Sequence, residues 1–495
     1  MPRPPRPPSG DHDPAMPPPE ALSRYGARLL DPGDVAVIGQ QRLRPTLYLA
    51  DQLLVLAAVR ARVLPTIADA ASELGLDAVE DDPPGGATCS VVRLTPKARA
   101  GAVVVDAWAV LQRARLLADP DFDAVDPGYP RLPGVELNHL MSIQPLTPAP
   151  YNSPHPYNSP HPYDGGASPY ADLAYTGPRP VTLIVDEPPK PPAPGIRTPV
   201  VAVLDTGVGQ HSWFAGAVQP IPLQNPAGKG ALPTTEFLGD PDRPLDGLRD
   251  PLAGHGSLIC GLVRQTCPEA RIISIRVVEA DGTIPQSNLV GALDQLHDML
   301  KAGTPVDVVS ISMGYYHEMP ADPADTVVLY AALKRLADEG VVVVASAGND
   351  STSREAFPAA LADTSKYSWG NGAMVSVGAL NPDGASVALY SNTGTWVTAW
   401  ERGSAVVSTM PQDFQFSREP SLRTPDLSGR VRAGVDADDF SGGFAIASGT
   451  SFAAPAVAGR IARALLRGGV LDAPQTESDA AARRDAMRQV VPNLA

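Results

Sequence analysis

Cysteine is scarce in this sequence, with only Cys89, Cys260 and Cys267 among 495 residues. An odd number at these spacings matches neither a disulfide framework nor a zinc site. No run approaches the roughly eighteen apolar residues of a membrane span, and the first residues lack the apolar segment of a secretory signal. We therefore expect a soluble protein in a reducing, cytoplasmic compartment, with export by an unusual route as the alternative.

An excess of positive charge is also missing. The chain has 39 Lys and Arg against 54 Asp and Glu, which gives a formal net charge of −15. Nucleic acids and anionic membranes attract basic proteins, and no basic stripe with interleaved aromatic residues is present. We expect no nucleic-acid or membrane partner.

Proline, in contrast, is abundant. Its 55 residues make about one position in nine, against about one in twenty in ordinary proteins. A chain of this length also exceeds the roughly 100–200 residues of one domain. We predict a disordered N-terminus (1–40), an α+β domain (41–143), a Pro-rich linker (144–197), a large α/β domain (198–470) and a tail (471–495). The linker repeats Tyr-Asn-Ser-Pro-His-Pro, but two histidines without a third donor do not predict a metal site.

The pattern within 41–143 predicts a small sheet with helices on one side. Strands are expected over 46–57, 77–80, 89–94 and 135–140. Helices are expected from Pro65 to Leu74 and around 103–117. The resulting β-α-β-β-α-β order is typical of an open-faced α+β sandwich. His139 stands alone there, and we interpret it as a surface or structural histidine rather than a ligand.

From residue 198 the sequence alternates between strands and helices. Apolar strands are predicted at 200–204, 271–277, 306–311 and 341–345, and helices between them show leucines on one face. This alternation predicts a mainly parallel sheet with helices on both faces. Functional residues of such sheets gather at the carboxyl ends of the strands.

Four polar residues occupy such positions. Asp205 follows a wholly apolar strand, and Asn349 follows another. His255 and Ser451 each precede an apolar run that predicts a helix. Singly, they fit a turn former, a loop residue, a cap neighbour and a helix cap. Together they fit nucleophilic catalysis, in which Ser451 attacks, His255 takes its proton and Asp205 orients the imidazole. Asn349 and the Ser451 N–H could then receive the developing oxyanion.

Four motifs in this order resemble the subtilisin-like serine proteases, or subtilases, over residues 200–468. They are Ala202–Val208, Gly254–Ser257, Ser346–Asn349 and Gly449–Pro455. The resemblance implies Asp205, His255 and Ser451 as the catalytic triad and Asn349 as the oxyanion donor. It also implies a substrate-pairing edge (Ser310, Ile311, Ser312, Met313, Gly314) and a specificity-pocket wall (Ala345, Ser346, Ala347, Gly348).

The resemblance further implies that 41–143 is a propeptide, which would act as an intramolecular inhibitor and be cut away. This sequence departs from the family at Trp400–Gly403, at Ser257 and in a charged insertion over 412–439. Calcium is frequent in the family, but only Asp240, Asp242 and Asp246 offer a weak acidic loop. We therefore predict no metal and no cofactor.

The sequence thus predicts a serine endopeptidase acting on protein or peptide substrates. An α/β-hydrolase esterase would need Gly-x-Ser-x-Gly and the order Ser, Asp, His, which this chain lacks. The alternative is a regulatory or binding protein whose protease domain is held inactive by its N-terminal domain.

Overall fold

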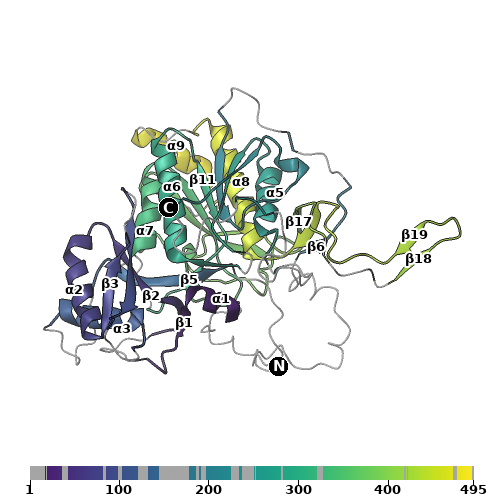
Figure 1. Ribbon diagram of the computed structural model, residues 1–495. Coiled ribbons are helices and arrows are strands. Elements are labelled where there is room, and N and C mark those ends of the chain that lie inside the picture. The colour runs from purple at the N-terminus through teal and green to yellow at the C-terminus, as the bar shows by residue number, and fades with distance from the viewer. Residues whose placement is uncertain are drawn as a thin grey trace, which may run out of the picture.

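The computed structural model describes residues 17, 19–35, 43–81, 85–98, 103–120, 132–143, 178–184, 189–190, 197–224, 234–236, 250, 252–279, 282–319, 327–416, 420, 422–471 and 476–492. A smaller N-terminal domain lies against a larger C-terminal one (Figure 1). The repeated linker motif and Asp240, Asp242 and Asp246 lie outside the described residues.

The N-terminal domain is built on an antiparallel sheet. Its strands are β1 (Ala27–Leu30), β2 (Thr46–Leu56), β3 (Leu76–Glu80), β4 (Cys89–Pro96) and β5 (Val135–Ser142). β2 pairs with β1, β4 and β5, and β3 extends the sheet beyond β4. Helices α2 (Arg60–Glu73) and α3 (Ala107–Ala118) pack on one face around a shared buried cluster. The predicted β-α-β-β-α-β order is confirmed.

Two predictions in this region are wrong. The stretch 1–40 is not wholly without structure, because α1 (Pro19–Tyr25) and β1 lie in it. β1 pairs with β2 and buries Leu30 completely, which outweighs the local proline content. Helix α2 begins at Arg60 rather than at Pro65. Pro65 is exposed, so its missing N–H leaves no buried backbone group unpaired.

A seven-stranded sheet forms the centre of the C-terminal domain. Its strands are β7 (Val200–Asp205), β8 (Val218–Ile221), β9 (Arg271–Arg276), β11 (Val308–Ile311), β13 (Val342–Ser346), β15 (Ala373–Leu380) and β16 (Ala399–Arg402). They lie in the order β16-β15-β13-β11-β7-β9-β8, and every neighbouring pair is parallel. The central strands are almost continuously apolar because both faces of the sheet are buried.

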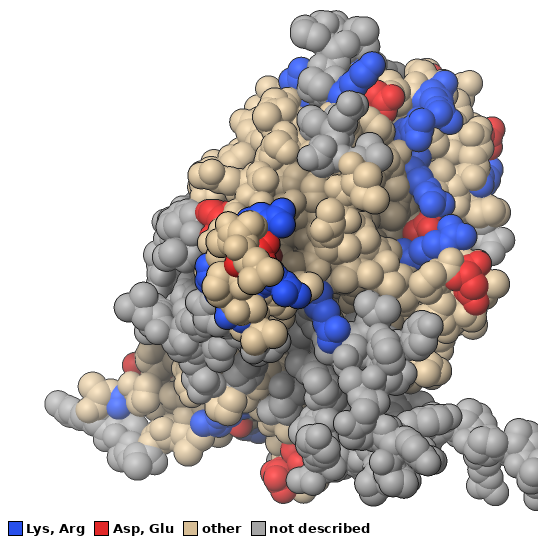
Figure 2. Space-filling model, turned by 90° about the vertical axis from the view of Figure 1, so that its right-hand side faces the viewer, with Lys and Arg blue, Asp and Glu red and all other residues tan. Residues whose placement is uncertain are grey.

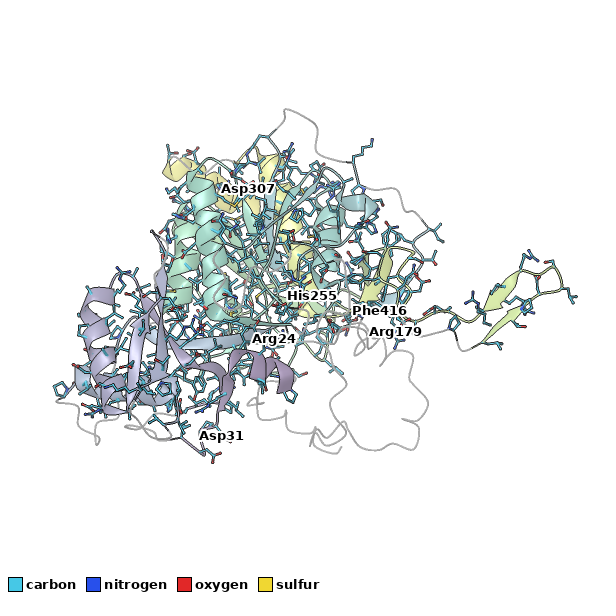
Figure 3. All side chains as sticks on the ribbon, viewed as in Figure 1. Arg24, Asp31, Arg179, His255, Asp307 and Phe416 are labelled. Atoms are coloured by element: carbon cyan, nitrogen blue, oxygen red, sulfur yellow. The ribbon has the colours of Figure 1, made fainter. Side chains whose placement is uncertain are left out.

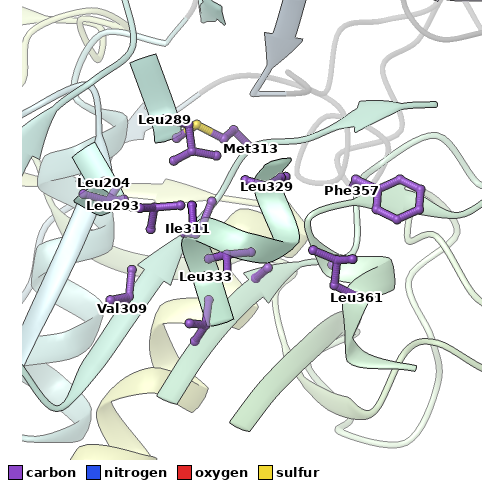
Figure 4. Close-up of a cluster of buried hydrophobic side chains, with 14 of the residues drawn as sticks. Leu204, Leu289, Leu293, Val309, Ile311, Met313, Leu329, Leu333, Phe357 and Leu361 are labelled. Atoms are coloured by element: carbon purple, nitrogen blue, oxygen red, sulfur yellow. The ribbon is translucent and has the colours of Figure 1, made fainter. Parts of the chain in front are cut away.

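Helices cover both faces, as predicted. α5 (His255–Thr266) and α8 (Thr450–Gly468) pack on one face with α9 (Glu477–Arg488). α6 (Gln286–Lys301) and α7 (Val327–Asp338) pack on the other, where Leu293, Val309 and Leu333 share a cluster (Figure 4). Helix α9 lies within the stretch predicted as a tail (471–495), so part of that stretch is helical.

Shorter elements surround this core. They are β6 (Arg179–Pro180) with β17 (Val406–Thr409) and β20 (Phe444–Ala447), β12 (Tyr315–Tyr316) with β14 (Ala356–Phe357), and β18 (Arg423–Pro425) with β19 (Val431–Ala433). β6 comes from the predicted linker. The β18–β19 hairpin projects from the body, and Figure 2 views the molecule from that side, with basic side chains on a largely uncharged face. Among the described helices, none is long and apolar enough to cross a membrane.

The two domains share backbone pairing. β10 (Thr283–Pro285) of the C-terminal domain pairs antiparallel with β5, and so joins the N-terminal sheet. Helices α6 and α7 lie beside that sheet. Asp294 on α6 accepts a hydrogen bond from the Thr88 N–H at 2.7 Å, and Arg335 on α7 donates to Asp294 at 2.6 Å and to the Gly86 carbonyl at 3.0 Å.

Candidate active site

A buried carboxylate–imidazole pair lies at the carboxyl end of the central sheet. Asp205 is the last residue of β7, and His255 is the first residue of α5. Asp205 Oδ1 lies 2.8 Å from His255 Nδ1 and accepts a hydrogen bond from the Thr206 N–H at 2.8 Å. A carboxylate only accepts, so Nδ1 carries the hydrogen in this contact. Figure 3 shows His255 far from Asp307, which precedes β11 at the amino end of the sheet.

Two glycines allow the start of α5 to approach β7. Gly254 has φ of +87°, a left-handed conformation that glycine adopts at little cost, directly before His255. At Gly256 an added Cβ would lie 2.1 Å from the Gly207 carbonyl oxygen. The Gly256 N–H, one of the unpaired donors in the first turn of α5, is satisfied by Thr206 Oγ1 at 3.0 Å. Helix and strand are thus joined through the residue that follows Asp205.

Ser451 lies in the first turn of α8, beside the start of α5. Its side chain is buried, and its carbonyl accepts a hydrogen bond from Ser312 Oγ at 3.1 Å. The ring of the next residue, Phe452, lies 5.3 Å from the His255 ring between centroids. The structure therefore brings the starts of both helices to the same end of the sheet.

Asn349 contacts the same loop. Its Oδ1 accepts hydrogen bonds from the Thr450 N–H at 2.9 Å and from Thr450 Oγ1 at 2.8 Å. These bonds identify the amide oxygen and turn Nδ2 toward Gly449, where an added Cβ would lie 3.5 Å from it. The Asn349 amide group therefore lies beside Gly449 and Thr450, the two residues that precede Ser451.

A second buried network adjoins Asn349. The Tyr316 hydroxyl donates to the Asp350 carboxyl at 2.5 Å, and the Asn392 amide donates to the same hydroxyl at 2.8 Å. Asn392 also donates to the Ala347 carbonyl at 2.9 Å. Burial raises the pKa of Asp350 to about 6. This network fixes the backbone between β13 and Asn349.

The predicted substrate-contacting residues fall into two groups. β11 pairs with β7 on one side and β13 on the other, so the prediction of an edge at Ser310 and Ile311 is wrong, because both backbones are already paired. Beyond the end of β11, Ser312 contacts Ser451, Met313 is buried and Gly314 has its N–H and carbonyl paired with Ser142. The predicted pocket wall is Ala345, Ser346, Ala347 and Gly348. Ala345 and Ser346 lie within β13, between β11 and β15, while Ala347 and Gly348 follow it.

The end of β5 pairs with the segment that follows β11. Ser142 exchanges two backbone hydrogen bonds of 2.9 Å with Gly314, and the Ile143 N–H donates to the Gly282 carbonyl at 2.9 Å. The end of the N-terminal domain thus lies as an extended strand between Gly282 and Gly314. Gly314 is two residues beyond Ser312, which contacts Ser451.

Sequence reasoning missed three residues that hold the site. Thr206 and Thr450 lie inside the recognised motifs, yet their hydroxyl contacts cross between segments. Glu236 accepts a hydrogen bond from the Gly254 N–H at 3.1 Å, but no local pattern around it points to His255. Only the tertiary fold brings it there.

Three buried potential metal ligands meet where the domains touch. They are His139, His317 and Glu318. His139 Nε2 lies 2.8 Å from Glu318 Oε2, and its Nδ1 lies 2.8 Å from Gln286 Oε1, whose amide donates to Glu136. Both ring nitrogens face oxygen atoms, an arrangement that favours the protonated imidazolium over a ligand with a free lone pair. The cluster is better described as a buried ion pair across the domain interface.

Comparison with known proteins adds the family. Residues 197–469 match the model described as the subtilase family. The "Thermophilic serine proteinase" of Bacillus sp. (strain AK1) is 24% identical over 241 residues, which cover 46% of this chain and 50% of that protein. "Mycosin-4" of Mycobacterium tuberculosis is 28% identical over 282 residues, 52% of this chain and 54% of that protein.

The chain thus spans about half the length of these curated relatives. A solved structure titled as a cold adapted subtilisin-like serine proteinase is 21% identical, with a TM-score of 0.35. The matched region covers 57% of this chain and 84% of the chain in that structure. The boundaries of the family match, 197–469, lie close to those predicted for the large domain.

Proposed function

The chain belongs to the subtilase family, and on that premise we propose that it is a serine endopeptidase whose nucleophile is Ser451. The observation that carries the proposal is the 2.8 Å contact between Asp205 and His255 at the start of α5, beside the start of α8. An imidazole held by a carboxylate can take the proton of a nearby hydroxyl and stabilise the resulting charge.

The residues supply each step of peptide-bond hydrolysis. His255 Nε2 removes the Ser451 hydroxyl proton while Oγ attacks the scissile carbonyl carbon. The imidazolium, stabilised by Asp205, then gives that proton to the leaving amine, and an acyl-enzyme remains on Ser451. Water then attacks the acyl carbon while His255 takes its proton. The imidazolium returns that proton to Ser451 Oγ as the acyl–oxygen bond breaks, and the second product leaves.

Negative charge on the carbonyl oxygen needs donors during both attacks. Asn349 Nδ2 and the Ser451 backbone N–H are the proposed donors. Their support is the pair of bonds that hold the Asn349 amide oxygen on Thr450. Removal of one such donor typically costs about 2.7–4 kcal/mol in the transition state.

We further propose that the N-terminal domain is an intramolecular inhibitor and that the chain is made as a zymogen. The support is the pairing of Ser142 with Gly314, which occupies backbone groups that an extended substrate would otherwise use. The same pairing also favours the alternative, in which the domain stays bound permanently and the protein acts as a binding or regulatory module. Cleavage distinguishes the two.

Labelling with a fluorophosphonate probe tests the nucleophile. The purified protein should be labelled, and Ser451→Ala should not be, because the probe reacts with an activated serine hydroxyl. Ser441→Ala, in the preceding loop, is the matched control and should be labelled like the wild type. Labelling of Ser451→Ala would overturn the assignment.

Self-cleavage tests the zymogen. The wild-type chain should be cut between Leu140 and Pro199, while Ser451→Ala stays at full length by intact-mass analysis. If both chains stay intact while the wild type still labels, the N-terminal domain is a permanent module.

A further inference from the structure

A buried glutamate that the peptidase mechanism does not use lies against the Asp205–His255 pair. Glu236 belongs to a short segment beside the loop after β7: its N–H donates to the Val208 carbonyl at 3.0 Å, and Thr235 forms a parallel bridge with Val208. Its side chain is 4% exposed. A buried carboxyl needs several polar partners to offset its lost hydration, so its contacts carry information about its role.

Those contacts are with the chain neighbours of Asp205 and His255. Glu236 Oε1 accepts a hydrogen bond from the N–H of Gly254, which precedes His255. The hydroxyl of Thr206, which follows Asp205, faces the same carboxyl and opposes the rise in its pKa. Thr206 Oγ1 in turn accepts the Gly256 N–H at 3.0 Å. One carboxyl therefore joins the end of β7 to both residues that flank His255.

We propose that Glu236 is a positioning residue, which sets the orientation of His255 relative to Asp205 by holding Thr206 and Gly254 together. This role rests on the proposed peptidase function. Among the described residues, Glu236 makes no hydrogen bond to Asp205, His255 or Ser451, so it acts through these two neighbours. Small displacements of a general base are costly, because proton transfer needs near-ideal geometry.

The charges around Glu236 determine which protonation state performs this role. Asp205 and Arg276 face it with opposite effects, and Cys260 of α5 lies within electrostatic range. Burial, the largest effect, raises the pKa of Glu236 to about 8. Glu236 Oε2 is buried and has no hydrogen-bond partner among the described residues. The carboxyl is therefore protonated at neutral pH, and its ionisation places a second negative charge beside Asp205.

The pKa shift gives the role a pH signature. A glutamate whose folded pKa is raised from about 4.5 to about 8 contributes stability below about pH 4.5, and this contribution is lost as the pH rises through 8. Glutamine resembles the protonated carboxyl in shape and in its ability to accept from Gly254. Glu236→Gln should therefore keep the geometry and remove the titration.

The test compares Glu236→Gln, Glu236→Ala and the surface control Glu269→Gln in the full-length chain. At pH 7 the rate of fluorophosphonate labelling should fall at least tenfold in Glu236→Ala and stay within threefold of wild type in the other two. The wild-type rate should decline above about pH 8, and the decline should be absent in Glu236→Gln. In a Ser451→Ala background, the melting temperature of Glu236→Gln relative to its parent should rise between pH 5 and pH 9.

A second pair of variants separates positioning from general loss of structure. Thr206→Val removes the hydroxyl that links Glu236 to Gly256. Its effect and that of Glu236→Ala should not add in the double variant, because both break one connection. Wild-type labelling by Glu236→Ala, or an unchanged alkaline decline in Glu236→Gln, would overturn the positioning role alone. A wild-type protein that does not label would overturn the proposed function and this role with it.

Discussion

Gly256 shows how a single hydrogen atom in place of a side chain permits the close approach of His255 to Asp205. It follows His255 and lies so close to the Gly207 carbonyl that an added Cβ would be 2.1 Å from the oxygen. The atoms in the way belong to the Gly207 backbone rather than to a flexible side chain, so they cannot simply rotate aside. Any larger residue must push α5, and His255 with it, away from Asp205.

We therefore expect Gly256→Ala to lower the rate of fluorophosphonate labelling at least tenfold. The matched control is Gly291→Ala in α6, where nothing lies within 4 Å of an added Cβ. That change should leave labelling unaltered and, from helix propensity, stabilise the protein by about 1 kcal/mol in thermal denaturation. If Gly256→Ala were labelled at the wild-type rate, the start of α5 and the loop after β7 could move apart without displacing His255.

At this scale, sequence predicted the residues that stand in short contiguous motifs. Asp205, His255, Asn349 and Ser451 each lie among glycines and small residues at the end of a strand or the start of a helix. Glu236 could not be predicted, because its contacts reach 18 residues along the chain to Gly254. Hydrogen bonds between distant segments leave no local pattern.

Among the elements, β5 has a role that its own sequence does not reveal. It is an inner strand of the combined sheet, between β2 and β10, and its last residues continue to Gly314. Its apolar pattern predicted a strand, but strand pairing depends on which edges the fold leaves open. For the same reason sequence placed Ser310 and Ile311 at an edge, although β11 is central.

Loosening the end of β5 should expose the site. Ser142→Pro removes the N–H that donates to Gly314, a bond worth about 1 kcal/mol. The open form should become about fivefold more populated, and fluorophosphonate should label the intact chain about fivefold faster. Ser142→Ala keeps the N–H and should label at the wild-type rate. Equal rates for Ser142→Pro and Ser142→Ala would contradict inhibition by this strand.

Across the whole molecule, the domain interface contains the buried His139–Glu318 pair. Burial alone would lower the pKa of His139, but the charge and hydrogen bond of Glu318 raise it above its usual value. The nearby charge of His317 and that of His139 hold the pKa of Glu318 well below its usual range despite burial. Tyr315 stacks on His139, and burial raises the pKa of Glu136 to about 7.

These shifts predict an interface that weakens as the pH rises. The raised pKa of His139 gives stability that is full below about pH 6.5 and is lost as the pH rises through its folded value. Glu136 adds a loss between about pH 4.5 and 7, and Glu318 loses its contribution only in strong acid. The Ser451→Ala chain should therefore melt at a lower temperature at pH 9 than at pH 6.

Removing the histidine tests the assignment. His139→Ala in the Ser451→Ala chain leaves Glu318 without its closest partner and should cost about 3–5 kcal/mol at pH 6. Calorimetry should show a smaller difference in unfolding free energy between this variant and its parent at pH 9 than at pH 6. The double change with Glu318→Ala should recover part of the loss, because no unpaired charge is left. A difference of equal size at both pH values would contradict the pair.

The placement of β10 has a consequence for the order of synthesis. Its partner β5 ends at Ser142, so β5 leaves the ribosome about 140 residues before Thr283, roughly 7–28 s earlier at ordinary rates of translation. The N-terminal domain then has time to fold alone, and it meets the emerging C-terminal half with one strand edge already formed. Ser451 is therefore made only after β5, the strand whose end pairs with Gly314, has had time to form.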